Sequence, residues 1–501
     1  MHRLYHINFC TGLCAKSKSI AQFRTVSRCG IAQFVSHCRE VLLVMTLDMT
    51  DISNTLKNNV KNCKCELKNT TKVQTNREEN LEEYEYVKTL KNIFDENLFP
   101  HDFDMWTVSK QYNWINENIS KFFPNVPESL LEYIPAFFHQ GDCNRSLVDI
   151  PEWLDMDKYR KGQKFVQDYF AATIIATLLS LFYAYSFENT LRPIILNGQS
   201  HTPYLGYKRY ISTIRRIINW YKGKPWVEGT PAYKDMQITR EMHMMVRNKL
   251  SRLSDDEINA ACTFANPWCP DRELLLNNFT AACPFEKIKQ RPYKLFAKSP
   301  YKQKYFNDVD MAVFQCCFVG LVLLYPNKFG VHNATDEDLE AFCHIWRCYG
   351  YFLGMEDKYN FCRGNLVEIK QRTRDFYQYW ALPNCKDTKP EYEHMTRCVV
   401  ELFNSFFPFI RMPYKTAMLL FIDAFDISMS HLYASFTRLE WITYNCWKFI
   451  FRHVLKLSSV RSLFNRVMYK VLDQAINYSP QKHAQLHKKS RKQVQDFSIK
   501  S

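Results

Sequence analysis

The feature that most restricts the fold of this chain is an uncharged, strongly apolar run from Tyr169 to Phe187. Such a segment must leave water, either in a bilayer, where a helix needs ~20 residues, or in the core of a large helical protein. The run is short for a membrane span and contains the polar residues Thr173, Thr177 and Ser180. It also begins directly after the charged Asp168. We therefore favour a buried central helix, with a membrane span as the alternative.

Helical spacing of apolar residues dominates the chain after residue 80 and predicts an all-α fold. The chain has only 13 Gly in 501 residues, whereas turn-rich β-architectures and Gly-rich phosphate loops need more. Helices are predicted over 84–98, 157–188, 207–221, 232–250, 308–324, 336–355, 366–380, 392–406, 415–425, 430–457 and 461–477. Thr335, followed by three acidic residues, marks one helix start. The stretch 259–305 has no clear period and is predicted to be an insertion or long loop.

Composition divides the chain into a central helical domain with extensions on both sides. The predicted segments are a targeting or disordered segment 1–45, a polar linker 46–80, a helical N-terminal extension 81–150, the central domain 151–400, a C-terminal helical region 401–478 and a basic tail 479–501. Residues 1–39 lack Asp and Glu, which is typical of a mitochondrial transit peptide. Met45 and Met49 follow closely, so a misplaced start codon is the alternative.

The formal charge of +15 lies partly at the two chain ends. The basic run 482–492 is interpreted as a solvated tail, with contact to an anionic membrane as the alternative. No nucleic-acid-binding motif is found, so no nucleic-acid partner is expected. The 18 Cys follow no repeated spacing, which favours buried free thiols over a disulfide framework. The pair Cys63 and Cys65 is only a weak metal-site candidate.

Two neighbouring predicted helices each carry three polar side chains at spacings of three, four or seven, which place them on one face. They are Arg209, Thr213 and Arg216 on the first helix, and Arg240, His243 and Arg247 on the second. An imidazole can ligate haem iron, guanidinium groups can neutralise propionates, and Met242, Met244 and Met245 offer an apolar wall. By spacing alone, an exposed or salt-bridged face is the commoner explanation. Phosphate-loop, nucleophile-elbow and zinc-protease motifs are absent from the sequence.

The central part of the chain resembles the rubber oxygenase/MpaB catalytic domain family. The segments that carry the likeness are Arg160-Lys-Gly-Gln163, Tyr207-Lys-Arg-Tyr-Ile-Ser-Thr213, Trp220-Tyr221, Pro225-Trp226, Ala232-Tyr233-Lys234, Arg240-x-x-His243, Phe318-Val-Gly320, Leu324-Tyr-Pro326, His344-Ile-Trp-Arg347, Gly350-Tyr351, Leu353-Gly354 and Glu356-Asp357. Each motif is loose, whereas their order and spacing together are fairly specific.

The resemblance implies an all-α fold with a globin-like core around a b-type haem and its iron. It also implies an oxidoreductase that acts with dioxygen on a hydrophobic, isoprenoid or lipid-like substrate. It makes His243 the iron ligand, Arg209 and Thr213 catalytic residues, and Arg240 and Arg247 cofactor-binding residues. Rubber-cleaving members have Lys where this chain has Ser212. This departure argues against rubber-like cleavage and leaves haem binding unaffected.

Two alternatives stay open at this stage. One is a non-catalytic haem- or lipid-binding protein of the same fold. The other is a membrane-associated helical scaffold, with residues 169–187 as anchor and the basic C-terminus as lipid contact. The aromatic segment 441–455 fits an interfacial or docking helix. The expected location is intracellular, with the endoplasmic reticulum and the mitochondrion as candidate membranes. His344 is interpreted as a structural residue or one that supports the site from outside.

Overall fold

The chain forms α-helices joined by short connections and single turns of tighter helix, so the predicted all-α class is confirmed. The computed structural model describes residues 75–282, 291–301, 304–407 and 411–494, with side chains from Leu81 on. Apart from isolated bridge positions at Gln140, Phe264 and Asn307, these residues contain no β-structure. The predictions made for 1–45, for most of the linker and for Cys63 and Cys65 lie outside the described residues.

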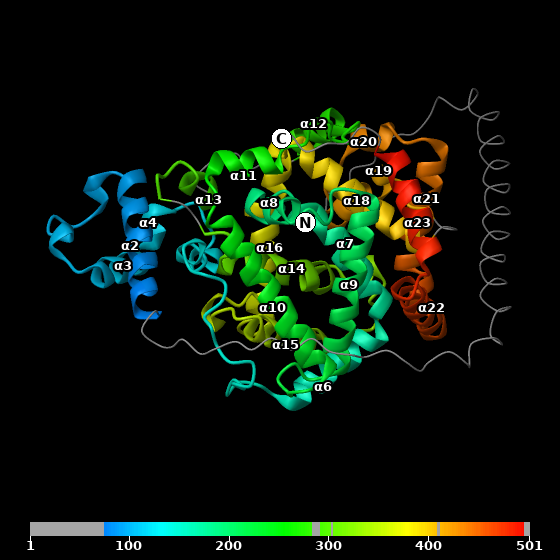
Figure 1. The fold of residues 1–501 in the computed structure, drawn as a ribbon, viewed down its shortest axis with the longest axis horizontal. Helices are drawn as coiled ribbons and strands as arrows, with labels where there is room; N and C mark the ends of the chain where they lie inside the picture. Colours follow the sequence, from blue (N-terminus) through cyan, green and yellow to red (C-terminus); the bar gives the residue numbers. More distant parts are fainter. Residues whose placement is uncertain (1–74, 283–290, 302–303, 408–410, 495–501) are drawn as a thin grey trace, which may run out of the picture. The chain divides into compact units, whose positions relative to one another are not determined.

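The apolar run forms α7 (Phe170–Ala184), and every residue of this helix except Thr177 is buried. α7 packs along α14 (Asp308–Leu324), which is nearly as completely buried, and both helices lie in the middle of the helical array (Figure 1). α19 (Tyr414–Ile422) and α22 (Ser458–Ile476) also pack on α7. This arrangement is the one expected of a core helix. Among the described residues, no single helix has the length and apolar composition of a membrane span.

The prediction of one long helix over 157–188 is wrong, because the chain bends by 86° between α6 (Met156–Asp168) and α7. The bend is made possible by the side chain of Asn465 on α22. Its Oδ1 accepts a hydrogen bond from the Ala171 amide at 3.0 Å, and its Nδ2 donates to the carbonyls of Gln167 and Asp168 at 3.2 and 2.8 Å. Asn465 thereby satisfies backbone groups that a continuous helix would pair internally.

α9 (Pro203–Lys222) and α10 (Pro231–Leu250) form an antiparallel helix pair at the positions predicted for 207–221 and 232–250. Both helices start in the same way. Thr202 and Thr230 cap them by accepting a hydrogen bond from the amide three residues on, and a Pro follows each cap. The caps are local signals and fix both helix starts. α15 (Asp336–Phe352) packs along α6, and the helix start predicted at Thr335 is present, with Thr335 and Asp338 forming a capping box.

Three further segments differ from the prediction. The supposed long loop 259–305 holds α11 (Asp255–Cys262), α12 (Arg272–Ala282) and α13 (Pro292–Phe296). The predicted helix 430–457 is divided into α20 (Ser430–Ala434) and α21 (Arg438–Arg452). The basic tail contains the unpredicted helix α23 (Pro480–Gln493), which packs against α9 while most of its residues are exposed.

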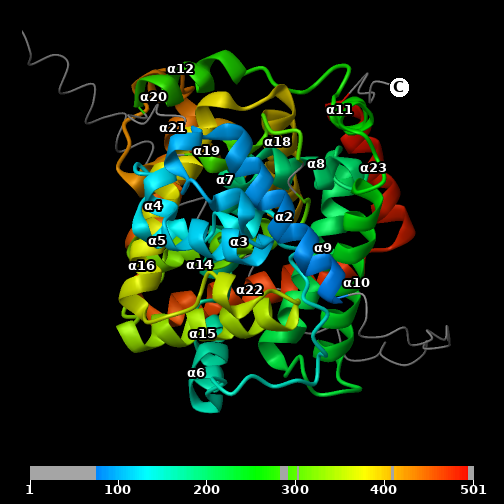
Figure 2. The ribbon, with the colours of Figure 1, turned by 90° about the vertical axis from the view of Figure 1, so that its left-hand side faces the viewer.

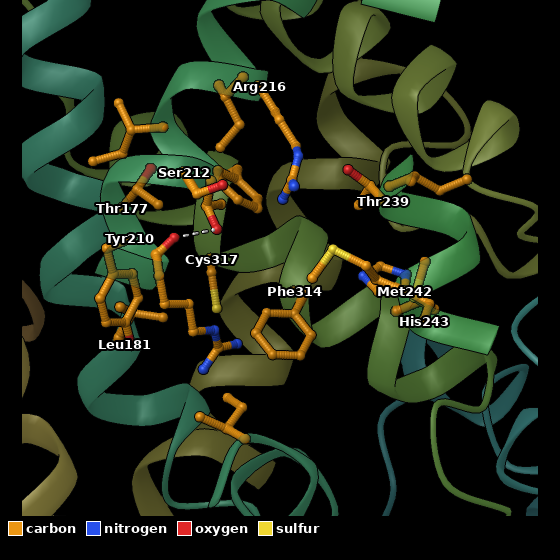
Figure 3. Close-up of a pocket in the computed structure, with 18 of the residues that line it drawn as sticks. Thr177, Leu181, Tyr210, Ser212, Arg216, Thr239, Met242, His243, Phe314 and Cys317 are labelled. Carbon is orange, nitrogen blue, oxygen red and sulfur yellow. Dashed lines mark hydrogen bonds between the residues drawn. The ribbon is translucent and has the colours of Figure 1, made fainter. Parts of the chain in front are cut away.

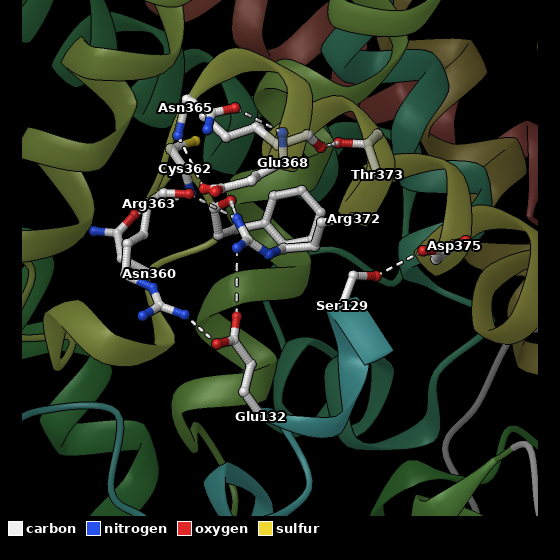
Figure 4. Close-up of polar contacts among 12 residues, drawn as sticks. Ser129, Glu132, Asn360, Cys362, Arg363, Asn365, Glu368, Arg372, Thr373 and Asp375 are labelled. Carbon is white, nitrogen blue, oxygen red and sulfur yellow. Dashed lines mark hydrogen bonds and ion pairs between the residues drawn. The ribbon is translucent and has the colours of Figure 1, made fainter. Parts of the chain in front are cut away.

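The N-terminal helices are joined to the central ones by polar contacts. α2 (Thr75–Ile93) and α3 (Val108–Glu117) pack on each other (Figure 2). Glu132, just after α5 (Glu128–Leu131), faces the guanidinium groups of Arg363 and Arg372 (Figure 4), and Arg372 Nη2 lies 3.4 Å from Glu132 Oε1. Ser129 Oγ donates to Asp375 at the end of α16 (Leu366–Asp375) at 2.7 Å. These bonds fix α5 against α16.

Candidate functional site

A cavity of about 610 Å³ lies among α7, α9, α10, α14 and α15. Cavities of this size are typical of sites for cofactors and drug-sized ligands. Aliphatic and aromatic side chains form most of its wall, among them Leu181, Ile217, Phe314, Phe318 and Trp346. The rings of Phe318 and Trp346 are stacked with their centres 3.9 Å apart. Because water finds few hydrogen-bond partners on such a lining, the interior favours an apolar ligand.

The cavity opens at the start of α9. Gln199, in the connection from α8 (Glu188–Leu196) to α9, and Lys208, in the second turn of α9, are the exposed members of its lining. The other lining residues are buried or half-buried. We call the opening marked by Gln199 and Lys208 the mouth. The mouth is polar, whereas the wall behind it is mostly apolar.

His243 projects from the middle of α10 into the cavity wall, next to Met242 (Figure 3). Its Nδ1 atom is buried and has no hydrogen-bond partner among the described residues. Its ring packs on Phe306, with 5.1 Å between ring centres, and Phe306 has a left-handed backbone conformation with φ of 54°. Burial, and secondarily the charge of Arg247, lower the pKa of His243 to about 4. The imidazole is therefore neutral near pH 7 and keeps a lone pair for a metal or a proton.

The polar side of the cavity is cationic. Lys208, Arg209 and Arg216 line it, and no Asp or Glu is among the described lining residues. Arg209 Nη1 donates to Ser200 Oγ at 2.8 Å. Arg216 points towards the middle of the cavity (Figure 3). Its Nε has no hydrogen-bond partner in the described part of the chain and lies 4.0 Å from Oδ1 of Asp235.

Burial is the main influence on both cavity guanidinium groups, and it lowers the pKa of Arg209 and of Arg216. Both groups remain charged near pH 7, because an arginine pKa starts far above that pH. Two charges that are partly desolvated and incompletely paired favour an anionic group on the ligand.

Hydroxyl groups surround the same space. Thr213 Oγ1 donates to the Arg209 carbonyl at 3.2 Å, which leaves its lone pairs free to accept a hydrogen bond. Ser212 also lines the cavity. Thr177 and Ser212 lie on one side of the cavity, and Thr239 lies near His243 on the other (Figure 3).

The site residues predicted from the sequence divide into two groups. Arg209, Thr213 and His243 come together on the wall of one cavity, and Arg216 joins them. Arg240 and Arg247 do not line it, although they flank His243 on α10. Arg240 forms an ion pair with Asp142, with 2.8 Å between Nε and Oδ2, and also donates to the carbonyl of Arg145.

Arg247 donates to the carbonyl of Phe306 at 3.2 Å, and it thereby supports the residue that packs on His243. Of the three Met expected as an apolar wall, only Met242 lines the cavity. Met244 and Met245 are 43% and 60% exposed. His344 lies outside the cavity lining and accepts a hydrogen bond from the Asp155 amide at 3.2 Å, which fits its structural interpretation.

Other functional candidates were not predicted from the sequence. Ser200 carries no motif that marks it. Lys208 lies within the segment Tyr207–Thr213, but nothing there singles out its side chain, and the apolar wall from α7 and α14 has the sequence of an ordinary core. Only its spacing of four residues from Ser212 places Lys208 near the same face of α9.

Among the described residues, no group of three or more His, Cys, Asp or Glu side chains is placed to hold a metal ion. His243 would therefore be a single protein ligand, and a single imidazole holds iron firmly only where a macrocycle supplies the other ligands. The donor set, the orphaned Nδ1 of His243 and the cationic wall fit a haem with its carboxylates. Comparison with protein-family models, with curated proteins and with solved structures gives no match for this chain.

Proposed function

We propose that the cavity binds a b-type haem whose iron His243 would hold, and that the protein is a haem-dependent oxidoreductase acting with dioxygen on a hydrophobic, isoprenoid or lipid-like substrate. The observation that carries this proposal is the meeting of Arg209, Thr213 and His243 on one cavity wall. Helical spacing and the family resemblance both point to these residues, and neither of them contains information on a large apolar cavity.

The residues of the chain have separate tasks in this proposal. His243 presents a neutral imidazole, because burial keeps its pKa near 4. Arg209 and Arg216 neutralise carboxylates that would otherwise be costly to bury. When bound, the haem supplies the redox-active iron at which dioxygen is activated. Thr213 donates its hydroxyl proton to the Arg209 carbonyl and can accept a hydrogen bond inside the cavity, and the apolar wall keeps bulk water away from the reacting groups.

The test is the ultraviolet–visible spectrum of the protein purified from haem-replete cells. The wild type should show a Soret band, and His243→Ala should lose it. His431→Ala is the matched control, because His431 is an exposed imidazole on α20, and this variant should keep the band. A colourless wild type would refute the proposal.

A loss of colour in His243→Ala can also come from misfolding, so a rescue experiment accompanies it. Adding free imidazole to His243→Gly should restore the band if the variant lacks only the ligand. Failure of the rescue in a variant with wild-type circular dichroism would count against His243 as the ligand.

A haem or lipid carrier is the second candidate, because an apolar cavity with a cationic wall suffices for binding without turnover. Oxygen consumption distinguishes the two functions. A haem-loaded protein that consumes no oxygen with any member of a panel of isoprenoids and unsaturated lipids would favour the carrier.

A further inference from the structure

We propose that the substrate of the cavity is an anionic amphiphile, an apolar chain that ends in a carboxylate or phosphate group, with the chain inside the cavity and the anionic group at Lys208 in the mouth. This inference rests on the proposed function in taking the cavity as the substrate site. It deepens that function by naming the substrate class.

The first argument is the charge of the lining. Three cationic side chains and no acidic one face the cavity in the part of the chain that the structure describes. Arg209 and Arg216 lie deeper and are only partly exposed, and they can serve the two carboxylates of a haem. Lys208 is then the one cationic residue of the described lining that the haem does not require. It forms no ion pair with a described residue, and its Nζ lies 6.0 Å from the centre of the Tyr204 ring.

The second argument is the distribution of polarity along the cavity. The exposed lining residues, Gln199 and Lys208, are both polar and both lie at the mouth. Of the four side chains that α7 contributes, Ile174, Leu178 and Leu181 are apolar and buried, and the fourth is the half-buried Thr177. A molecule with one charged end and one long apolar end matches this gradient. A neutral hydrocarbon would leave the ammonium group of Lys208 without a counter-charge.

The third argument is the position of α23. This helix carries Lys and Arg residues and no acidic residue, and it packs beside the mouth on the first turn of α9. The Tyr204 amide donates to Ser490 Oγ at 3.1 Å, and the Tyr204 ring lies 5.0 Å from the ring of His487. The mouth therefore lies next to an exposed basic helix. A field of one sign beside an opening raises the local concentration of ligands of opposite charge.

The experiment measures binding of cis-parinaric acid and of its neutral methyl ester to the full chain by fluorescence. The wild type should bind the acid about tenfold more tightly than the ester, and 0.5 M NaCl should weaken binding of the acid more than that of the ester. Lys208→Glu should weaken binding of the acid about tenfold and leave the ester unchanged. Dodecyl phosphate and dodecanoate, added as competitors, distinguish a phosphate from a carboxylate head group.

The matched control is Lys234→Glu, which makes the same charge change at an exposed lysine of α10 that does not line the cavity. Equal binding of acid and ester, binding of neither probe, or equal effects of Lys208→Glu and Lys234→Glu would overturn the inference. The Soret band is recorded on the same samples. A colourless protein that prefers the acid through Lys208 would refute haem binding and support the head-group site. A coloured protein without that preference would support haem binding and refute the head-group site.

Discussion

The bend between α6 and α7 depends on one side chain, so replacing Asn465 by Ala is a direct test of how the core is built. Asn465 is 7% exposed, and its amide group bonds to three backbone groups at the break. Alanine removes all three partners and introduces no new polar group. The amide of Ala171, at the first turn of α7, then has no acceptor in its surroundings.

The cost follows from the burial of each bond. The bond to the Ala171 amide is buried, and an orphaned buried donor costs ~1–3 kcal/mol. The two bonds to the carbonyls of Gln167 and Asp168 are partly buried, and each contributes ~0.5–1.5 kcal/mol. The free energy of unfolding should therefore fall by roughly 2–6 kcal/mol. For a folded unit of about 430 residues, one kcal/mol corresponds to about 1 °C in Tm, so the Tm should fall by roughly 2–6 °C.

Differential scanning calorimetry of the wild type and the variant gives this shift. Gln474→Ala is the control, because Gln474 lies on the same helix, is exposed and forms none of these bonds. Its Tm should stay within about 1 °C of the wild type, since surface substitutions rarely exceed ±0.5 kcal/mol. If Asn465→Ala lowers the Tm no more than Gln474→Ala does, the bend is maintained by packing and this reasoning is wrong.

Three further predictions concern charge and close packing. Burial lowers the pKa of His243 and of His394 from 6.5 to about 4, so between these pH values the unfolded chain binds protons that the folded chain does not. The Tm of the haem-free protein should thus fall as the pH is lowered from 7 to 4.5, and it should fall less steeply in His243→Gln. Equal slopes of Tm against pH in the two proteins would contradict the lowered pKa of His243. Arg240→Ala leaves the Asp142 carboxylate, which is 9% exposed, without its guanidinium partner. The free energy of unfolding in a urea titration should fall by ~3 kcal/mol. The double variant with Asp142→Ala should recover part of this loss, and both variants should keep any Soret band. In Gly162→Ala, the new Cβ would lie 2.3 Å from the Ala341 carbonyl oxygen, so α6 and α15 must separate at a cost of ~1–3 kcal/mol; a Tm equal to that of the exposed Lys164→Ala would show that the helices adjust freely.

Helices with local start signals could be predicted well from the sequence. The predicted range 308–324 coincides with α14, whose capping box begins at Asn307, and α10 begins one residue before its predicted start. The break before α7 could not be predicted, because the groups that stabilise it belong to Asn465, far away in the sequence.

The helix α12 was missed for a related reason, whereas α11 was missed although it has its own capping box formed by Ser254 and Glu257. The segment before α12 is held by side chains of α18 (Pro390–Phe406), where Glu391 accepts from the Phe264 amide and Glu393 from the Asp271 amide, both at 3.0 Å. These partners cannot be seen from the stretch itself, which is rich in Pro and Cys and shows no helical period. Apart from α11, local pattern therefore predicts elements that cap themselves, and it fails where another element supplies the cap.

The candidate site shows the same division. Spacing brought Arg209, Thr213 and His243 together, and all three line the cavity. Spacing also grouped Arg240 and Arg247 with His243, because positions three or four apart on a helix lie only ~40–60° apart around its axis. That difference is enough to turn Arg240 towards Asp142 and Arg247 towards the carbonyl of Phe306. The neighbours that decide between such directions cannot be seen in one helix.

The regular phase of α9 also restricts how this protein can change in evolution. Lys208, Arg209, Ser212, Thr213, Arg216 and Trp220 all reach the cavity from one uninterrupted helix. An insertion or deletion of one residue inside it would rotate every later side chain by ~100° and exchange the cavity face for the face that packs on α18. Descendants that keep the site should therefore preserve the length of α9 strictly. Changes in length should instead accumulate in the connection 223–230, where no residue contributes to the lining.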